Sequence, residues 1–369
     1  MAVDAARLEE LAQAFEIFSE YDAAGTSPLY ERLAMAVSAD EQLLGLAAEA
    51  RFAPIPNLFF AAVHLRLFEV PDDPLARYYR SLSGEATLAP DGDELPGLLR
   101  AFCMRERGAL VETLHRRRVQ TNEPRRSIYL LLLLAAVQRL HPDRPLALVE
   151  VGSSAGLNLQ FDRYAYDLAG QKLGPAGSEV TLKCEIVGPP PPMPTEIPRL
   201  ADRAGIDLHP LDVGDESDVA WLRALTWPDH GERRRVLDKA ITIAQEEPPE
   251  VMEGDALDLL PAVIHGMPRD AWTCVFDSFS LSHFDGSQRA RFASILQELA
   301  HQRPIAWISA EANGVVMAAP RRPSDGPHQR GSFFGVLGLI HFGPRGSVEL
   351  PLGYGDGHAR WVEWLNPDV

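Results

Sequence analysis

The residues best suited to chemistry lie in the segment from Pro145 to Tyr166, PLALVEVGSSAGLNLQFDRYAY. An unbroken apolar run from Leu146 to Val149 predicts a strand that is buried on both faces. Glu150 follows, and a turn of small residues from Gly152 to Gly156 leads into apolar residues at a helix-like spacing. Strand, glycine turn and helix form the opening unit of a nucleotide-binding α/β fold, because glycines allow close backbone approach and a helix N-terminus favours negative groups.

The turn lacks the full G-x-G-x-x-G fingerprint of dinucleotide-binding folds. Its acid-x-Gly pattern, Glu150 and Gly152 at the end of a strand, resembles class I S-adenosylmethionine (SAM) methyltransferases. That resemblance implies that the turn faces the methionine part of SAM, although Ser154 stands where these enzymes often have a middle glycine. The residues expected around this cofactor are Glu150, Gly152, Ser153, Ser154, Gly156, Asn158, Glu185, Asp255 and Ala256.

Further acids follow the later strands that the sequence predicts. Glu185 lies near the end of an expected strand from Val180 to Val187, where a ribose-binding acid is usual, and Asp255 follows the next short strand. The resemblance places Asp255 near the adenine amino group. Ligands of open α/β sheets bind at successive strand ends, although Asp255 is also a suitable helix cap.

A buried strand over 272–276 leads to Asp277 and Ser278. In the methyltransferase interpretation these residues bind or deprotonate the methyl acceptor, and His283 is a second candidate base. Asp277 is also a suitable turn residue, so a structural role stays open.

The segment Gln120–Arg126, QTNEPRR, precedes an apolar helix. Thr121 or Asn122 can cap that helix, but Arg125 and Arg126 are unfavourable at a helix start unless an anion lies near. We therefore expect Asn122, Arg125, Arg126 and Ser278 to contact a substrate with an anionic group. Solvated surface charge is the alternative.

The same turn satisfies G-x-S-x-G, the pattern of a serine-hydrolase nucleophile elbow at Ser154. Asp277 followed by His341 or His358 has the chain order of a hydrolase triad. Such an elbow normally follows several strands of its own sheet, whereas the preceding residues look helical. A third alternative is a non-catalytic nucleotide-binding or regulatory protein.

The composition narrows the class of protein. The chain has 369 residues, 46% of them apolar, and a formal net charge of −17, which argues against a nucleic-acid partner. Its three cysteines show no metal-ligand spacing, and no metal is expected. The N-terminus lacks a signal-peptide core, and the longest apolar run, Ile128 to Val137, is too short for a membrane span. We expect a cytoplasmic protein that acts on a small molecule, without membrane contact.

Two regions follow from the periodicity. The pattern over residues 1–120 predicts an all-helical cap domain, in which we expect His64 to be a core histidine. Residues 121–369 predict an α/β core with a mostly parallel sheet, antiparallel closing strands and a proline-rich insertion at about 188–231. A polar loop is expected at 321–330.

Four segments resemble the bacterial domain-of-unknown-function family 2332 along nearly the whole chain. They are QTNEPRR, VEVGSSAGLN followed after three residues by DRY, RAGIDLHPLDV and EGDALDLLP. The resemblance implies a Rossmann-like, SAM-methyltransferase-like core behind a helical N-terminal region, and the activity has to be argued from the site.

Overall fold

The computed structural model describes residues 4–324, 334–343 and 346–365. The described chain forms two compact units. The first comprises residues 1–121 and 215–238, and the second comprises residues 122–214 and 239–369. The helical region predicted at the N-terminus therefore also takes in part of the segment that we expected to be an insertion in the core.

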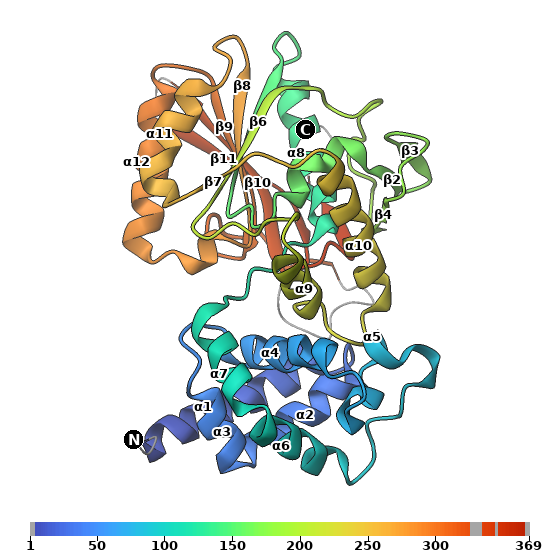
Figure 1. Cartoon of the computed structure of the whole chain (residues 1–369). Helices are drawn as coiled ribbons and strands as arrows, with labels where there is room; N and C mark the ends of the chain where they lie inside the picture. Colours follow the sequence, from blue (N-terminus) through green and yellow to red (C-terminus); the bar gives the residue numbers. More distant parts are fainter. Residues whose placement is uncertain (1–3, 325–333, 344–345, 366–369) are drawn as a thin grey trace. The chain divides into compact units, whose positions relative to one another are not determined.

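The first unit is helical (Figure 1). Its helices begin where the sequence predicts, because Ser27 accepts a hydrogen bond from the Tyr30 amide with Pro28 in the first turn, and Asp40 caps the next helix. The elements are α1 (Ala5–Ile17), η1 (Phe18–Ala23), α2 (Pro28–Ser38), α3 (Glu41–Ala47), α4 (Ile55–Glu69), η2 (Pro74–Tyr78), α5 (Arg80–Ser83), η3 (Gly84–Ala86), α6 (Leu95–Arg105), α7 (Arg107–Arg116), α9 (Glu216–Ala224) and the first half of α10 (Gly231–Glu246).

His64 of α4 is fully buried in this unit, as the sequence predicts for a core histidine. Its ring nitrogens bond the Ala224 carbonyl at 3.0 Å and the Ser81 hydroxyl at 2.7 Å. Burial lowers the pKa of His64 to about 3, so the ring is neutral near pH 7.

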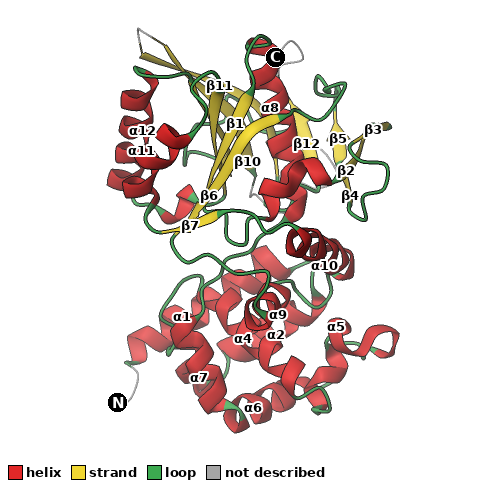
Figure 2. Cartoon of the chain, turned by 45° about the horizontal axis from the view of Figure 1, so that its top comes forward, coloured by secondary structure: helices red, strands yellow, loops and turns green. Residues whose placement is uncertain are grey.

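The second unit is built on a nine-stranded sheet among the described residues, in the order β5-β12-β11-β10-β9-β8-β1-β6-β7. Figure 2 shows the strands of this unit in yellow. The parallel part consists of β1 (Leu146–Val151), β6 (Leu200–Asp207), β7 (Val251–Glu253), β8 (Trp272–Ser278) and β9 (Ile305–Ala312). The closing strands are β10 (Gly335–Gly343), β11 (Gly346–Gly355) and β12 (Trp361–Trp364), antiparallel as predicted, followed at the edge by β5 (Glu185–Val187).

Helices cover both faces of this sheet (Figure 1). The apolar helix α8 (Ser127–Leu140) packs against β9 and β10 on one face. On the other face lie α11 (Ala256–Gly266) and α12 (Gly286–Ala300), which bury Leu260 and Phe292 against Val149 and Trp307. Because successive strand residues alternate, Val149 and Val151 point to the α11/α12 face and Glu150 points to the α8 face.

The prediction of a single strand over residues 180–187 is wrong. Its residues form two strands in different sheets, β4 (Thr181–Lys183) and β5, and β4 joins β2 (Ala165–Leu168) and β3 (Gln171–Leu173) in a small second sheet. The core strand beside β1 is β6, which lies within the predicted insertion. Its start is polar and exposed, so its sequence does not show the alternation of a buried strand.

Two smaller differences complete the comparison. The helix expected after the glycine turn is a short 3₁₀ helix, η5 (Leu157–Arg163). The polar loop expected at 321–330 lies partly outside the described residues. None of the helices that the structure describes is both long and apolar enough to cross a membrane.

Candidate functional site

The turn after β1 is held by the neighbouring strand β6. The Gly152 amide donates to the Ile206 carbonyl at 2.8 Å, and the Ser154 amide donates to Oδ2 of Asp207 at 2.8 Å. Gly152 has φ +74°, and a Cβ there would lie 2.4 Å from the Ser280 Cβ. A Cβ on Gly156 would meet Pro249, so packing within the protein accounts for both glycines without a ligand.

Glu150 lies beneath this turn in a buried chain of polar groups. Its Oε1 accepts from Nδ2 of Asn158 at 2.9 Å, and Oδ1 of Asn158 accepts from the Ser127 hydroxyl at 3.1 Å. The sequence therefore places Glu150 and Asn158 correctly in one cluster. Burial raises the pKa of Glu150 to about 8, against the opposing effects of Asn158 and the charge of Arg126.

Asp207, and not Glu185, is the acid at the end of the strand beside β1. Its Oδ1 accepts from the His209 amide at 2.9 Å, which together with the Ser154 bond orients the carboxylate toward the turn. Glu185 begins β5, the strand at the opposite edge of the sheet from β7. The prediction that Glu185 ends the second core strand is wrong because the expected strand over 180–187 divides at Cys184.

Asp255 follows β7, at the end of the third core strand as predicted. Its side chain accepts from the Leu257 amide at 2.8 Å and caps α11, whose first residue is the buried Ala256. The structural role that the sequence left open for Asp255 is thus present. Asp255 is exposed, so its second oxygen can meet solvent or a ligand.

The two candidate bases, Asp277 and His283, differ in their exposure to solvent. Asp277 is fully buried on the α11/α12 face, where its oxygens accept from the Trp307 indole and from the Ser309 hydroxyl at 2.7 Å. Burial raises the pKa of Asp277, and the nearby charge of Glu311 raises it further. His283 is exposed at the end of η6 (Leu281–His283). The two bonds give Asp277 a structural role in the core, and its assignment as a base that touches the acceptor stays a prediction.

Glu311 is an acid that the sequence interpretation did not select. It lies on β9, is 1% exposed, and its Oε1 accepts from the Leu281 amide at 2.7 Å. Burial raises the pKa of Glu311 to about 7. The position was visible in the sequence as the acid that ends the fifth core strand, ISAE, by the same strand-end rule that selected Glu150.

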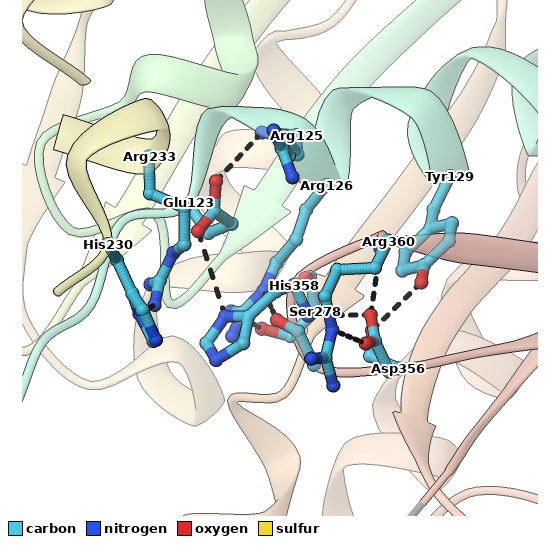
Figure 3. A network of polar contacts seen from close by, with 11 residues as sticks. Glu123, Arg125, Arg126, Tyr129, His230, Arg233, Ser278, Asp356, His358 and Arg360 are labelled. Carbon is cyan, nitrogen blue, oxygen red and sulfur yellow. Dashed lines mark hydrogen bonds and ion pairs between the residues drawn. The ribbon is translucent and has the colours of Figure 1, made fainter. Parts of the chain in front are cut away.

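The predicted substrate residues Arg125 and Arg126 lie in η4 (Pro124–Arg126), which leads into α8, and Ser278 ends β8 (Figure 3). Asn122 does not cap the helix, because its Oδ1 accepts from the Leu157 amide at 3.0 Å and so joins this segment to the β1 turn. Glu123 instead bonds the Arg125 amide at 3.3 Å. Arg125 is half-buried beside it.

Arg126 crosses from α8 to two other segments (Figure 3). Its Nε donates to the Gly357 carbonyl at 2.9 Å and its Nη1 to the Ser278 carbonyl at 3.1 Å. The guanidinium lies 4.8 Å from the centre of the Phe279 ring. The charge of Arg126 lowers the pKa of both Glu150 and Glu311.

Buried polar atoms without a hydrogen-bond partner concentrate at this edge of the sheet. Among the described residues they include Oε2 of Glu150, Oγ of Ser153, Oγ of Ser278 and Oε2 of Glu311. Residues other than glycine with positive φ concentrate there too, at Ser154, Phe279 and Ala359. An unpaired buried polar atom and a positive φ outside glycine each cost folding free energy, and both occur preferentially at functional sites.

Two other kinds of site receive no support. Within the described chain no group of three or more His, Cys, Asp or Glu side chains is arranged to hold a metal ion. β1 is also the first strand that the structure describes, so the Ser154 turn lacks the preceding strands of a nucleophile elbow.

Comparison of the sequence with protein families agrees with the motifs. Residues 12–364 match the family described as "Uncharacterized protein conserved in bacteria (DUF2332)". The chain belongs to the DUF2332 family. A comparison with curated proteins found no match. Support for the chemistry of this DUF2332 protein therefore comes from its residues at the carboxyl ends of the parallel strands.

Proposed function

We propose that this DUF2332 protein binds SAM at the carboxyl ends of β1, β6 and β7 and transfers its methyl group to a small molecule. The observation that carries the proposal is the sheet order around β1. β6 lies on one side of β1 and β8 on the other, so the connections diverge at this point. Open α/β sheets bind ligands outside the carboxyl ends of the strands at such a switch point.

The side chains at this point suit an adenosyl ligand. Asp207 ends the strand next to β1, where an acid can accept from the two ribose hydroxyls, and it is partly exposed. Gly152 is exposed at the start of the turn, and Glu150 beneath it keeps one buried oxygen without a partner. Bound SAM would supply an electrophilic methyl group on a sulfonium, whose positive charge the acids at these strand ends would favour.

SAM is preferred over a dinucleotide for two reasons. The turn carries an acid two residues before Gly152 and lacks the second and third glycines of the dinucleotide fingerprint, where Ser154 and Leu157 stand. The sheet continues after β9 with antiparallel strands, an arrangement typical of the methyltransferase fold. A binding protein without catalysis would use the same site, and only transfer of a labelled methyl group to an acceptor separates the two.

The test is isothermal titration calorimetry with SAM and S-adenosylhomocysteine, with NAD as the competing ligand. Asp207→Asn should weaken SAM binding roughly 10- to 150-fold, the cost of a hydrogen bond to a charged group. Asp202→Asn is the matched control, because Asp202 lies on the same strand but is exposed near its start. No SAM binding by the wild type, or equal affinity in both folded variants, would overturn the proposal.

A further inference from the structure

Arg126 places a cation at the start of the 14-residue helix α8, where it is the N-cap residue. The preceding turn, η4, is capped by Glu123, whose side chain accepts from the Arg125 amide. A cation at a helix N-terminus opposes the helix dipole, and an anion bound to the Arg126 guanidinium would reduce that cost.

Ser278 gives a second and independent sign of a ligand. It is 7% exposed, and its hydroxyl is buried without a hydrogen-bond partner. Ser278 continues β8 past Asp277, which pairs with Val151, so it lies beside the exposed Gly152. By the alternation of the strand it points to the α8 face, where Arg126 holds its carbonyl at 3.1 Å.

The surrounding loops fix Arg126 in place. Its guanidinium is held by carbonyls from two separate segments and lies against Phe279, whose φ of +53° is unfavourable for an aromatic residue. Asp356 orders the second segment, because its Oδ1 accepts from the amides of His358 and Arg360 at 3.1 and 2.9 Å. A guanidinium held this rigidly loses little freedom when it binds a planar anion.

We propose that Arg126 and the hydroxyl of Ser278 bind a carboxylate group of the ligand beside the β1 turn. This inference rests on the proposed function for the source of the carboxylate, which is either the methionine part of SAM or the methyl acceptor. Both sources offer the same chemistry: a planar anion that accepts from a guanidinium and a hydroxyl.

Several charged groups surround this site. The charge of Arg126 lowers the pKa of Glu150 on β1 and of Glu311 on β9, and the charge of Glu311 raises the pKa of Asp277 on β8. Asp356 and Arg360 pair with each other, and His358 lies 3.7 Å from Glu123. The charge of Asp207 on β6 raises the pKa of Glu150. Ionisation of Glu150 and Glu311 adds negative charge beside Arg126, so carboxylate binding should weaken from pH 6 to pH 9.

The first experiment does not depend on SAM. Thermal unfolding is measured in sodium acetate and in sodium chloride at equal ionic strength. Acetate should stabilise the wild type more than chloride does, and less at pH 9 than at pH 6. Ser278→Ala should reduce the acetate effect and leave the chloride curve unchanged, because the hydroxyl it removes bonds nothing in the protein. Arg126→Met should abolish the effect, and Arg291→Met on α12 is the control at an exposed arginine.

The second experiment identifies the source by calorimetry with SAM and 5′-methylthioadenosine, which lacks the amino-acid part. If SAM supplies the carboxylate, Ser278→Ala weakens SAM binding about three- to tenfold and leaves methylthioadenosine binding unchanged. If the acceptor supplies it, both adenosyl ligands bind the variant normally while the acetate effect is still lost. Equal acetate and chloride curves in the wild type would overturn the carboxylate site, whatever the outcome with SAM.

Discussion

Glu150→Gln should change how the stability of the second unit depends on pH. The folded protein holds the pKa of Glu150 at about 8, against an ordinary value of 4.5. Between these two values the folded state binds the proton and the unfolded state does not, so stability falls as the pH rises from 4.5 to 8. The loss is about 3 kcal/mol at pH 7 and about 4 to 5 kcal/mol at pH 9, relative to pH 4. Glutamine has nearly the same shape, can accept from Asn158, and does not titrate.

The assay is urea unfolding followed by hydrogen exchange of peptides that contain β1, at pH 5, 7 and 9. The variant should match the wild type at pH 5 and exceed its stability increasingly at pH 7 and 9. All other titratable groups are the same in both proteins, so the difference between the two curves isolates Glu150. A constant difference across the pH range would show that Glu150 is ionised in the folded protein and would refute the reasoning.

Two further predictions concern single side chains. Fluorophosphonate should not label Ser154 in the wild-type protein. Ser154→Ala should change SAM affinity by no more than about fivefold, because at most one neutral hydrogen bond is lost. Stoichiometric labelling at Ser154 would instead support the hydrolase alternative. The pKa of His64 is lowered to about 3, so stability of the helical unit should fall as the pH drops below 6.5, by about 2 kcal/mol at pH 5. Hydrogen exchange of α4 should show that His64→Gln removes this pH dependence of stability. The control is His115→Gln on α7, which should leave the pH dependence in place. Equal acid sensitivity in the two variants would contradict the prediction.

The glycine turn and its acid could be predicted because local rules dominate there. A buried strand needs an apolar run, and a tight turn needs residues that accept positive φ. Glu150, Gly152 and Asn158 therefore lie together as the sequence indicates. The helix starts at Ser27 and Asp40 were predictable for the same reason, since capping depends on neighbouring residues alone.

The pairing of distant segments could not be predicted in the same way. The first four residues of β6 are exposed or half-buried, and one of them, Arg203, pairs with Asp162 of η5. Its place beside β1 comes from pairing with that strand and not from its own sequence pattern. Asp207 was missed for this reason, and Glu185 was selected because the segment over 180–187 alternates more clearly than β6 does.

The helical unit is assembled from two separate stretches of chain, and this has a consequence for synthesis. Trp221 of α9 is fully buried in that unit, where its indole donates to the Arg118 carbonyl at 2.9 Å. Chains emerge from the ribosome N-terminus first, so residues 1–121 wait without this part of their core until residues 215–238 have been made. In that interval β1 and β6 are already available for pairing. The part of the protein that is translated first therefore cannot complete its core until residues 215–238 have been made, and the apolar surface that Trp221 covers stays unfilled during that interval.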